Sequence, residues 1–574
     1  MNEHLRVAVL CAGVAMCLHC DALCAAQQSK QVPPVQVSTR MVTLEVVARD
    51  HQGHHATGLT AADFQLFEET RGGKEKQEQK IAVFRELHIA DLAAQAGNEL
   101  QVPAGVYTNM VTLQKEPVPP TILLVDGLNT EVGFQAQVHV QMLKMLRSLP
   151  SNVPVAVFLF GHRLQMLQDF TADPRLLQAA LGKAITTAGH GVATLDPNDD
   201  PDALSAQLAT LPHPPAGLIE AATKFEEETY RSTMDMRVNE TVEALISLGR
   251  HLAGFPGRKN LLWISTAFPI ALGDLRSMGQ VYSHASQIQR LVGVLSEAKV
   301  AVYPINPAGV LPPTVFEPGT RPRDISGFGM MSTQQREIAR LNAEQDTMEA
   351  VAEGTGGLIC TGTNDLGECV EKAVGDSSAF YEIAYYPDLQ DWNGEYRKII
   401  LKTRQSGLHL AYRGGYFATA QGAGNTADQK AELQSACGDY LDATSIFIAA
   451  KRLPPDSPEK LKFYLMASLP ALTLVPMRDG SLELNVTVAV CTFDQKGEPL
   501  QLMSEQVNRK FDGQEYQSLT AAGGFAHMLS IPGPKPTAVR LMVKDIPSGR
   551  LGSVRIKVDD TTAAPALPSG NGTQ

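Results

Sequence analysis

The sequence predicts an α/β protein in which a doubly wound, mostly parallel sheet is flanked by an N-terminal and a C-terminal β-sandwich domain. Two observations support this prediction. Between residues 120 and 418, short apolar runs alternate with longer segments of helical periodicity. On either side, at 35–88 and 461–558, apolar and polar residues alternate in short stretches that turn-forming residues separate.

Length and charge exclude some classes of protein. The chain has 574 residues, of which 44% are hydrophobic, so it can build packed cores in about three or four domains. It carries 49 lysines and arginines against 61 aspartates and glutamates, a net charge of −12. The basic residues are scattered rather than gathered into a stripe, so we expect no nucleic-acid partner.

Residues 1–26 are expected to be a secretory signal peptide. A lone Arg6 precedes a 12-residue apolar run at 7–18, and small residues follow at Ala25 and Ala26. A membrane span needs about 20 apolar residues, and the rest of the sequence has no such run. We therefore expect an exported protein, periplasmic or extracellular, without a transmembrane segment after cleavage.

Four cysteines follow this segment, and an even number is typical of disulfides in an oxidising compartment. Cys360 ends a predicted strand and Cys369 lies in the next predicted helix, so these two can pair. That leaves Cys437 to pair with Cys491. The alternative is four buried free thiols.

The first expected domain is a small β-rich one at 35–88. It has strands at 35–39 and 41–48, a turn at 50–53, and further strands at 64–67 and 80–84. Thr60 is placed to cap a short helical turn between them. Residues 89–118 hold few signals and lead into a proline-rich linker that ends at Pro120.

The α/β domain is expected over 120–418. Strands buried on both faces are predicted at 121–125, 153–160, 259–264 and 300–305. Helices are predicted at 134–148, 173–184, 216–253, 276–298 and 332–353. Inserted loops are predicted at 186–215 and 307–331, and alternating stretches within 379–412 are expected to extend the sheet or to cover its edge. Arg258 and Lys259, directly before a strand, are expected to be solvated.

A linker is expected at 419–430, followed by the C-terminal domain at 431–560. Within it, 431–451 predicts a helix, and 461–558 predicts strands that turns such as Arg478-Asp-Gly480 separate. The small, polar tail at 561–574 is expected to be disordered.

Several segments taken together resemble the VWFA-related domain family described in acidobacteria, whose core is a von Willebrand factor A-like domain behind a short β-rich segment. They are Leu59-Thr-Ala-Ala-Asp-Phe64, Leu124-Val-Asp-Gly-Leu-Asn-Thr130, Gln168-Asp-Phe-Thr-Ala-Asp173, Phe255-Pro-Gly-Arg-Lys-Asn-Leu-Leu-Trp-Ile-Ser265, Val302-Tyr-Pro-Ile-Asn306, Gly354-Thr-Gly-Gly357 with Thr363-Asn-Asp365, and Tyr412-Arg-Gly-Gly-Tyr416. The resemblance covers residues 35–418, and the C-terminal part looks like the β domain that often follows in such proteins.

The resemblance implies a ligand site at the carboxyl edge of the sheet. There the wider A-domain class holds a divalent cation with Asp-x-Ser-x-Ser, a Thr from a second loop and an Asp from a third. Asp126 matches the first Asp and Thr130 the last hydroxyl, but Leu128 takes the middle Ser position. Ser265-Thr266-Ala267 stands where the third-loop Asp is usual. The second-loop hydroxyl would come from Thr187 or Thr194.

Partner contacts are accordingly expected at Asp126, Asn129, Thr130, Ser265 and Thr266, with one Mg²⁺, Mn²⁺ or Ca²⁺ held by Asp126 and Thr130. In the alternative, Asp126 ligates no metal and accepts hydrogen bonds from the amides of the turn that follows it. Asn129 and Thr130 would then cap the next helix.

Common enzyme motifs are absent from the sequence, which has no Gly-x-Ser-x-Gly, His-Glu-x-x-His or Gly-x-x-x-x-Gly-Lys-Ser/Thr. We therefore expect a non-catalytic, adhesion-like module that binds a protein partner at the edge of the α/β sheet. The alternative is a metal-free structural or assembly scaffold of the cell envelope.

Overall fold

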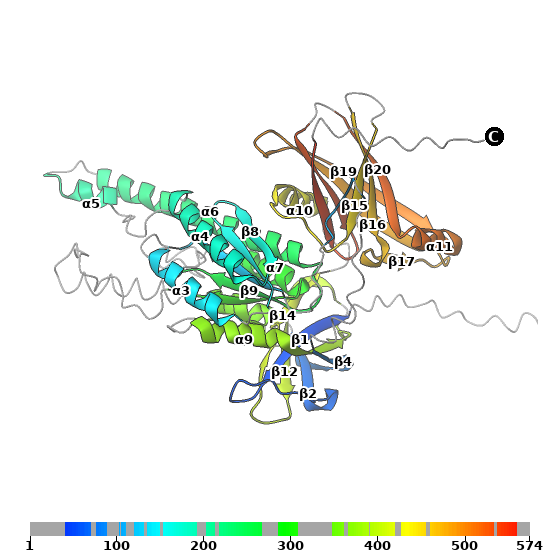
Figure 1. Cartoon of the computed structure of the whole chain (residues 1–574), viewed down its shortest axis with the longest axis horizontal. Helices are drawn as coiled ribbons and strands as arrows, with labels where there is room; N and C mark the ends of the chain where they lie inside the picture. Colours follow the sequence, from blue (N-terminus) through cyan, green and yellow to red (C-terminus); the bar gives the residue numbers. More distant parts are fainter. Residues whose placement is uncertain are drawn as a thin grey trace, which may run out of the picture. The chain divides into compact units, whose positions relative to one another are not determined.

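The computed structural model describes residues 41–69, 76–88, 103, 105–110, 120–130, 135–149, 153–191, 203–212, 217–266, 285–307, 347–360, 366–389, 391–419, 426–454, 460–532 and 536–558 (Figure 1). The expected signal peptide, the strand at 35–39, most of the loop at 307–331 and the C-terminal tail lie outside these residues. Within the ranges just given, no helix is long and apolar enough to cross a membrane.

The α/β domain is built on a five-stranded sheet with the strand order β10-β9-β6-β7-β8. Its strands are β6 (Thr121–Asp126), β7 (Val155–Phe160), β8 (Leu164–Thr171), β9 (Lys259–Ile264) and β10 (Val300–Ile305). All neighbours are parallel except β8, which runs antiparallel to β7. The sheet is therefore the mostly parallel one that the sequence predicts, and its winding reverses between β6 and β9.

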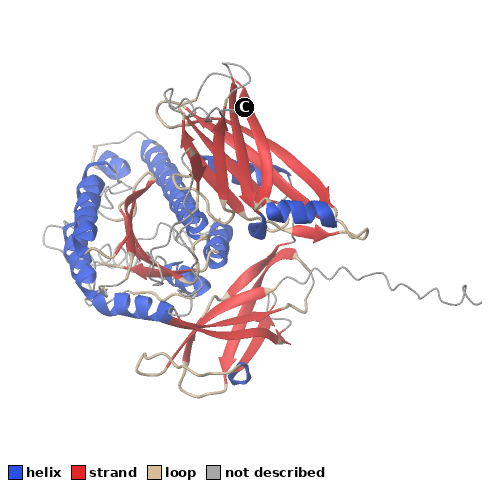
Figure 2. Ribbon diagram, turned by 45° about the vertical axis from the view of Figure 1, so that its right-hand side comes forward, coloured by secondary structure: helices blue, strands red, loops and turns tan. Residues whose placement is uncertain are grey.

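Helices cover both faces of this sheet (Figure 2). α6 (Leu218–Leu252) and α7 (Ala285–Glu297) share one hydrophobic core with it. α3 (Gln135–Ser148), α4 (Pro174–Gly191) and α9 (Leu366–Ser378) share a second core on the opposite face. Because alternate residues of each central strand serve the two cores, β6, β7, β9 and β10 are buried throughout. The helix predicted at 332–353 is described from residue 347 and continues to 355.

The stretches within 379–412 do not extend this sheet, so the first of the two alternatives expected for them is wrong. β11 (Ala379–Tyr385) pairs with β4 (Ile81–His88), and β13 (His409–Ala411) pairs with β1 (Val42–Arg49). The resulting sheet has the order β13-β1-β11-β4. A period of two in the sequence identifies a strand but not its partner, so the pairing across some 300 residues was not predicted.

A second sheet of the N-terminal region has the order β14-β12-β2-β3. Its strands are β2 (Phe64–Glu69), β3 (Lys76–Gln79), β12 (Asn393–Thr403) and β14 (Gly415–Thr419). It also combines strands from before and after the α/β domain. The 3-10 turn η2 (Ala61–Asp63) precedes β2, and Thr60 and Asp63 form its capping box, as the sequence suggests for Thr60.

The predicted inserted loop at 186–215 is partly helical. α4 continues to Gly191, and α5 (Ala203–Ala209) packs on α6. The Glu226 carboxylate of α6 accepts hydrogen bonds from the backbone N–H groups of Leu204 and Ser205, at 3.2 Å for the latter. These bonds satisfy N–H groups that the first turn of α5 leaves unpaired. Because turn-forming residues are frequent around α5, the composition of this segment predicts a loop and does not indicate the short helix.

The C-terminal region contains two antiparallel sheets that enclose one hydrophobic core. One sheet has the order β20-β16-β15-β5, and the other has the order β17-β18-β21-β22 with β19 beside β18. The strands are β5 (Val106–Thr108), β15 (Ile448–Leu453), β16 (Lys460–Ser468), β17 (Leu474–Pro476), β18 (Leu482–Phe493), β19 (Pro499–Phe511), β20 (Gly524–Pro532), β21 (Ala538–Asp545) and β22 (Leu551–Lys557). β5 thus comes from the segment 89–118, in which the sequence shows few signals.

Three short helical elements accompany these sheets. α10 (Thr426–Gly438) ends earlier than the helix predicted at 431–451, whose last residues belong to β15. α11 (Gly513–Ala521) begins at Asp512, which forms a capping box with Glu515. η5 (Leu469–Ala471) is a 3-10 turn after β16.

Arg258 and Lys259 are buried, so the expectation that they are solvated is wrong. Lys259 Nζ donates to the backbone O of Phe255 at 2.8 Å, and Arg258 donates to the Tyr303 hydroxyl at 3.3 Å. Burial lowers the pKa of Lys259 to about 7, although the nearby Glu45 carboxylate opposes this shift.

We expect Lys259 to make the protein more stable as the pH rises from about 7 to about 10.5. Below that window the amine is protonated in both the folded and the unfolded chain. Within it, the unfolded chain binds a proton that the folded chain has released, so the free energy of unfolding increases with pH. Urea unfolding of wild type and Lys259→Met at about pH 7 and about pH 9 measures this effect. A rise of equal size in both proteins would contradict the assignment.

Candidate functional site

The expected site residues lie where β6 and β9 end side by side. Asp126 is the last residue of β6, and Asn129 and Thr130 lie in the turn after it. Ser265 and Thr266 directly follow β9, which is paired with β6. The structure thus brings these five residues to the point where the winding of the sheet reverses, which is where doubly wound sheets bind their ligands.

Asp126 is fully buried, and its carboxylate accepts three hydrogen bonds from residues that the structure describes. Oδ1 accepts one from the backbone N–H of Asn129 at 2.9 Å. Oδ2 accepts one from Asn129 Nδ2 at 2.8 Å and one from Trp263 Nε1 at 3.0 Å. Burial raises the pKa of Asp126, and the hydrogen bonds from Asn129 and Trp263 oppose that shift. Through these hydrogen bonds the carboxylate holds the turn after β6 against the neighbouring strand β9.

Asn129 extends this network to α6 and to the end of β9. Its Nδ2 also donates to Thr241 Oγ1 at 3.0 Å, and Thr241 donates in turn to the backbone O of Arg237 at 2.7 Å. Thr266 Oγ1 donates to the backbone O of Asn129 at 3.3 Å. One hydrogen-bonded network thereby joins the turn after β6, strand β9 and helix α6.

Sequence reasoning missed three residues of this network, namely Trp263, Thr241 and Arg237. Trp263 stands on the strand beside β6 and inside a segment that carries the resemblance, so its place near Asp126 was open to prediction. Arg237, which donates to the backbone O of Leu128, and Thr241 lie one turn apart on α6. No motif marks that part of the helix, so the sequence offers no signal for them.

The donor set around Asp126 does not fit a divalent cation. Such cations take oxygen ligands, about six to eight for Ca²⁺, whereas three N–H groups already point at this carboxylate. Leu128 is buried and apolar. Asn129 Oδ1 is buried without a hydrogen-bond partner in the described part of the chain, and together with the Thr130 hydroxyl it falls short of a coordination shell.

Two threonines were predicted to supply the second-loop hydroxyl. Thr187 belongs to α4, and Thr194 lies outside the described residues. Within the ranges that the structure describes, no group of three or more His, Cys, Asp or Glu side chains is placed to hold a metal ion. The geometry therefore favours the structural role of Asp126 over its role as a metal ligand.

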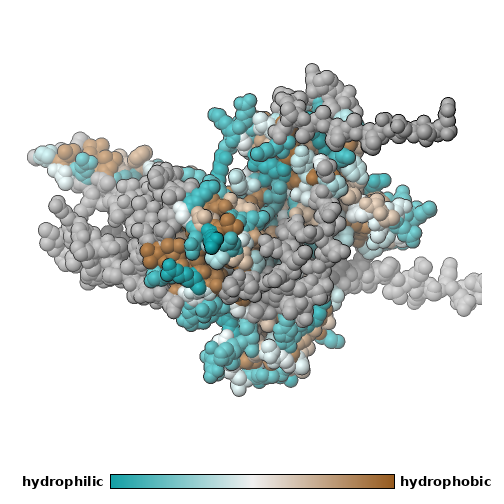
Figure 3. All heavy atoms as spheres, in the orientation of Figure 1, coloured by the Kyte–Doolittle hydropathy of each residue, from teal (hydrophilic) through white to brown (hydrophobic). Residues whose placement is uncertain are grey.

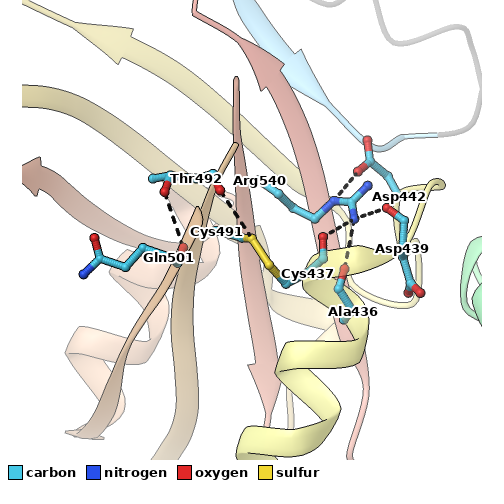
Figure 4. The surroundings of a disulfide bond; sticks show 8 residues. All are labelled: Ala436, Cys437, Asp439, Asp442, Cys491, Thr492, Gln501 and Arg540. Carbon is cyan, nitrogen blue, oxygen red and sulfur yellow. Dashed lines mark hydrogen bonds and ion pairs between the residues drawn. A yellow bond between two sulfur atoms is a disulfide. The ribbon is translucent and has the colours of Figure 1, made fainter. Parts of the chain in front are cut away.

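Two disulfides join the four cysteines that were expected to pair. Cys360 is bonded to Cys369 with a Cα–Cα distance of 6.1 Å, and Cys437 to Cys491 with 5.7 Å. Both distances lie within the range of about 4.4–6.8 Å that disulfides require. The second bond ties α10 to β18 (Figure 4).

Arg540 of β21 lies beside this second disulfide, with its guanidinium directed at the end of α10 (Figure 4). It donates to the backbone O atoms of Ala436 at 2.9 Å and Cys437 at 3.1 Å, and it also donates to that of Asp439. It pairs with the Asp442 carboxylate at 3.4 Å. Carbonyl groups that the last turn of a helix leaves unpaired are satisfied in this way.

No protein-family profile and no curated protein matches the sequence. A partial likeness is found to an aerotolerance-related membrane protein from Bacteroides fragilis NCTC 9343, with a TM-score of 0.23 and 12% identity over 45% of this chain and 98% of that chain. The manganese-loaded TRAP protein of Plasmodium vivax gives a TM-score of 0.22 and 9% identity over 58% and 97%. A von Willebrand factor type A structure from Catenulispora acidiphila gives 0.18 and 8% over 67% and 74%. TM-scores this low do not establish a shared fold. The fold assignment therefore depends on the strand order and the helix placement in this structure.

Proposed function

We propose that this chain is an exported, non-catalytic protein-interaction module whose α/β domain binds a partner protein at the carboxyl edge of its sheet. The observation that carries this proposal is the convergence of Asp126, Asn129 and Thr266 at the reversal of strand order, where sheets of this kind bind ligands. The resemblance to A-domain proteins agrees with it. In this proposal Asp126 holds the turn in shape and binds no metal.

The environment of Asp126 supports a non-catalytic role. A general acid or base must come within hydrogen-bond distance of the proton that it transfers. The Asp126 carboxylate is fully buried, and three N–H groups occupy it. A substrate at the sheet edge therefore has no access to this carboxylate.

The two disulfides support export. Disulfides persist in oxidising compartments and are rare in the cytosol. The bonds Cys360–Cys369 and Cys437–Cys491, together with the signal peptide expected at 1–26, favour the periplasm or the extracellular space.

A metal-free scaffold of the cell envelope is the second candidate, and the closed network at Asp126 favours it. In that case the network serves stability, and the contacts with partners lie away from the carboxyl edge of the sheet. The two candidates therefore differ in whether a partner touches the carboxyl edge of the sheet.

Photocross-linking in cells that produce the protein separates the two candidates. A photoreactive amino acid replaces the exposed His162, which follows the carboxyl end of β7. The matched control is the exposed Arg175 after β8, because β8 runs antiparallel and ends at the opposite edge. If the chain is an interaction module, we expect a discrete cross-linked species with the photoreactive residue at position 162 and none with it at position 175. No species at 162, or the same species at both positions, would favour the scaffold.

A further inference from the structure

We propose that a helical arm, defined as residues 203–212 and 218–236, is a second contact surface that binds a basic amphipathic helix of a protein partner. The arm consists of α5, the residues that follow it and the N-terminal half of α6. Figure 1 shows α5 beside the N-terminal end of α6. The proposal goes beyond the sheet edge, because it requires no contact near His162.

The arm is a helical element that extends past the sheet. α6 has 35 residues, which corresponds to a length of about 50 Å. Its C-terminal half contributes Val238, Leu245 and Leu252 to the core beneath the sheet. None of the described side chains at 218–236 belongs to that core. Glu226 instead binds the backbone N–H groups at the start of α5, which holds the two helices together.

Large apolar side chains form an exposed line along this arm. Leu218, Phe225 and Met236 are all exposed, the last two at 63% and 51%. They are spaced by seven and eleven positions, close to two and three turns of an α-helix, so they lie on one face. Leu204 and Leu211 on the α5 side are also exposed. Figure 3 shows hydrophobic residues gathered on the same arm.

Single exposed apolar residues are common in proteins, whereas several large ones on one helical face favour a contact surface. A helical face with apolar residues at these spacings is suited to a second amphipathic helix that lies along it.

The charge of the arm indicates what kind of helix fits. Residues 218–236 contain five acidic residues against two basic ones, and α5 has no charge. The acidic residues are Glu220, Glu226, Glu227, Glu228 and Asp235, and the basic ones are Lys224 and Arg231. Of these, Glu228 is exposed one turn after Phe225. Charge complementarity therefore favours a basic partner, and like charges disfavour pairing with the same arm of a second copy.

The test uses the full mature chain and a fluorescent helical peptide of about five turns, with leucines on one face and lysines elsewhere. The control peptide carries glutamates in place of the lysines. We expect the basic peptide to bind wild type, and Phe225→Ser to weaken its binding about tenfold or more. Leu500→Ser is the matched protein control, because Leu500 is 60% exposed on β19 and lies outside the arm. It should leave binding unchanged.

Several results would overturn the proposal. These are no binding of the basic peptide to wild type, equal binding of the acidic peptide, and equal binding to wild type and Phe225→Ser. A dimer in sedimentation that Phe225→Ser abolishes would show that a second copy, not a basic partner, occupies the arm. His162 lies against Glu240, about four turns of α6 beyond Phe225, so cross-linking at His162 and peptide binding at Phe225 report on different surfaces and the two proposals can fail independently.

Discussion

Replacing Asp126 by alanine is expected to lower the free energy of unfolding by about 3–5 kcal/mol. The substitution removes the carboxylate that accepts hydrogen bonds from three buried N–H groups, two from Asn129 and one from Trp263. Each such group costs about 1–3 kcal/mol, and relief from burying the carboxylate offsets part of the total. Urea unfolding of the mature chain measures the loss.

Asp173 provides the matched control for this substitution. Its carboxylate is exposed and accepts a hydrogen bond from the backbone N–H of Arg175 in the first turn of α4. Asp173→Ala removes only a helix cap, so we expect a loss of about 1 kcal/mol. Equal losses for the two aspartates would show that the buried network contributes nothing of its own.

The same variant tests the role of Asp126 as a metal ligand. After chelation, we expect calorimetric titration with Mg²⁺, Mn²⁺ or Ca²⁺ to give no stoichiometric heat with wild type. A ligand role predicts the reverse, namely a heat that Asp126→Ala abolishes while the fold keeps its stability. That combination would contradict the structural role and restore the metal site that the resemblance implies.

The second large effect is expected at the disulfide between Cys437 and Cys491. Replacing both by alanine should lower the free energy of unfolding by about 4 kcal/mol, because the bond spans 54 residues and restricts the unfolded chain. The bond between Cys360 and Cys369 spans 9 residues, so its removal should cost about 2.5 kcal/mol. Alanine is preferred to serine because all four cysteines are buried.

Urea unfolding of the two double variants, each with and without a reductant, measures these losses. The reductant should destabilise wild type and should have a smaller effect on each double variant, which retains one bond. If the reductant left the wild-type curve unchanged, the bonds would not be contributing to stability.

The central sheet could be predicted closely because burial on both faces leaves a clear pattern. β9 has the predicted bounds, and all six of its residues are buried. β8 was not predicted as a strand, since most of its side chains are only partly buried and its apolar residues do not form a continuous run. Edge strands and pairings between distant segments depend on contacts that no local pattern records.

Part of the candidate site could be predicted for a different reason. Asp126 and Thr266 follow predicted parallel strands, and such strands end at a common edge. Thr241 comes from a helix more than 100 residues after Asp126, and only packing brings its hydroxyl to Asn129. The burial of Lys259, the first residue of β9, was missed because a lysine at the end of a strand is usually solvated.

The pairing of early strands with late ones constrains the order in which this chain can fold. β1 and β4 are synthesised early, yet their partners β13 and β11 lie some 300 residues later, beyond the entire α/β domain. β5 likewise pairs with β15, which lies far later in the chain. At about 5–20 residues per second, translation of the intervening chain takes roughly 15–60 s, during which these strands have unpaired edges. The α/β domain, whose own strands are contiguous in the chain, can complete its sheet first and so bring the two halves of the N-terminal sheets together.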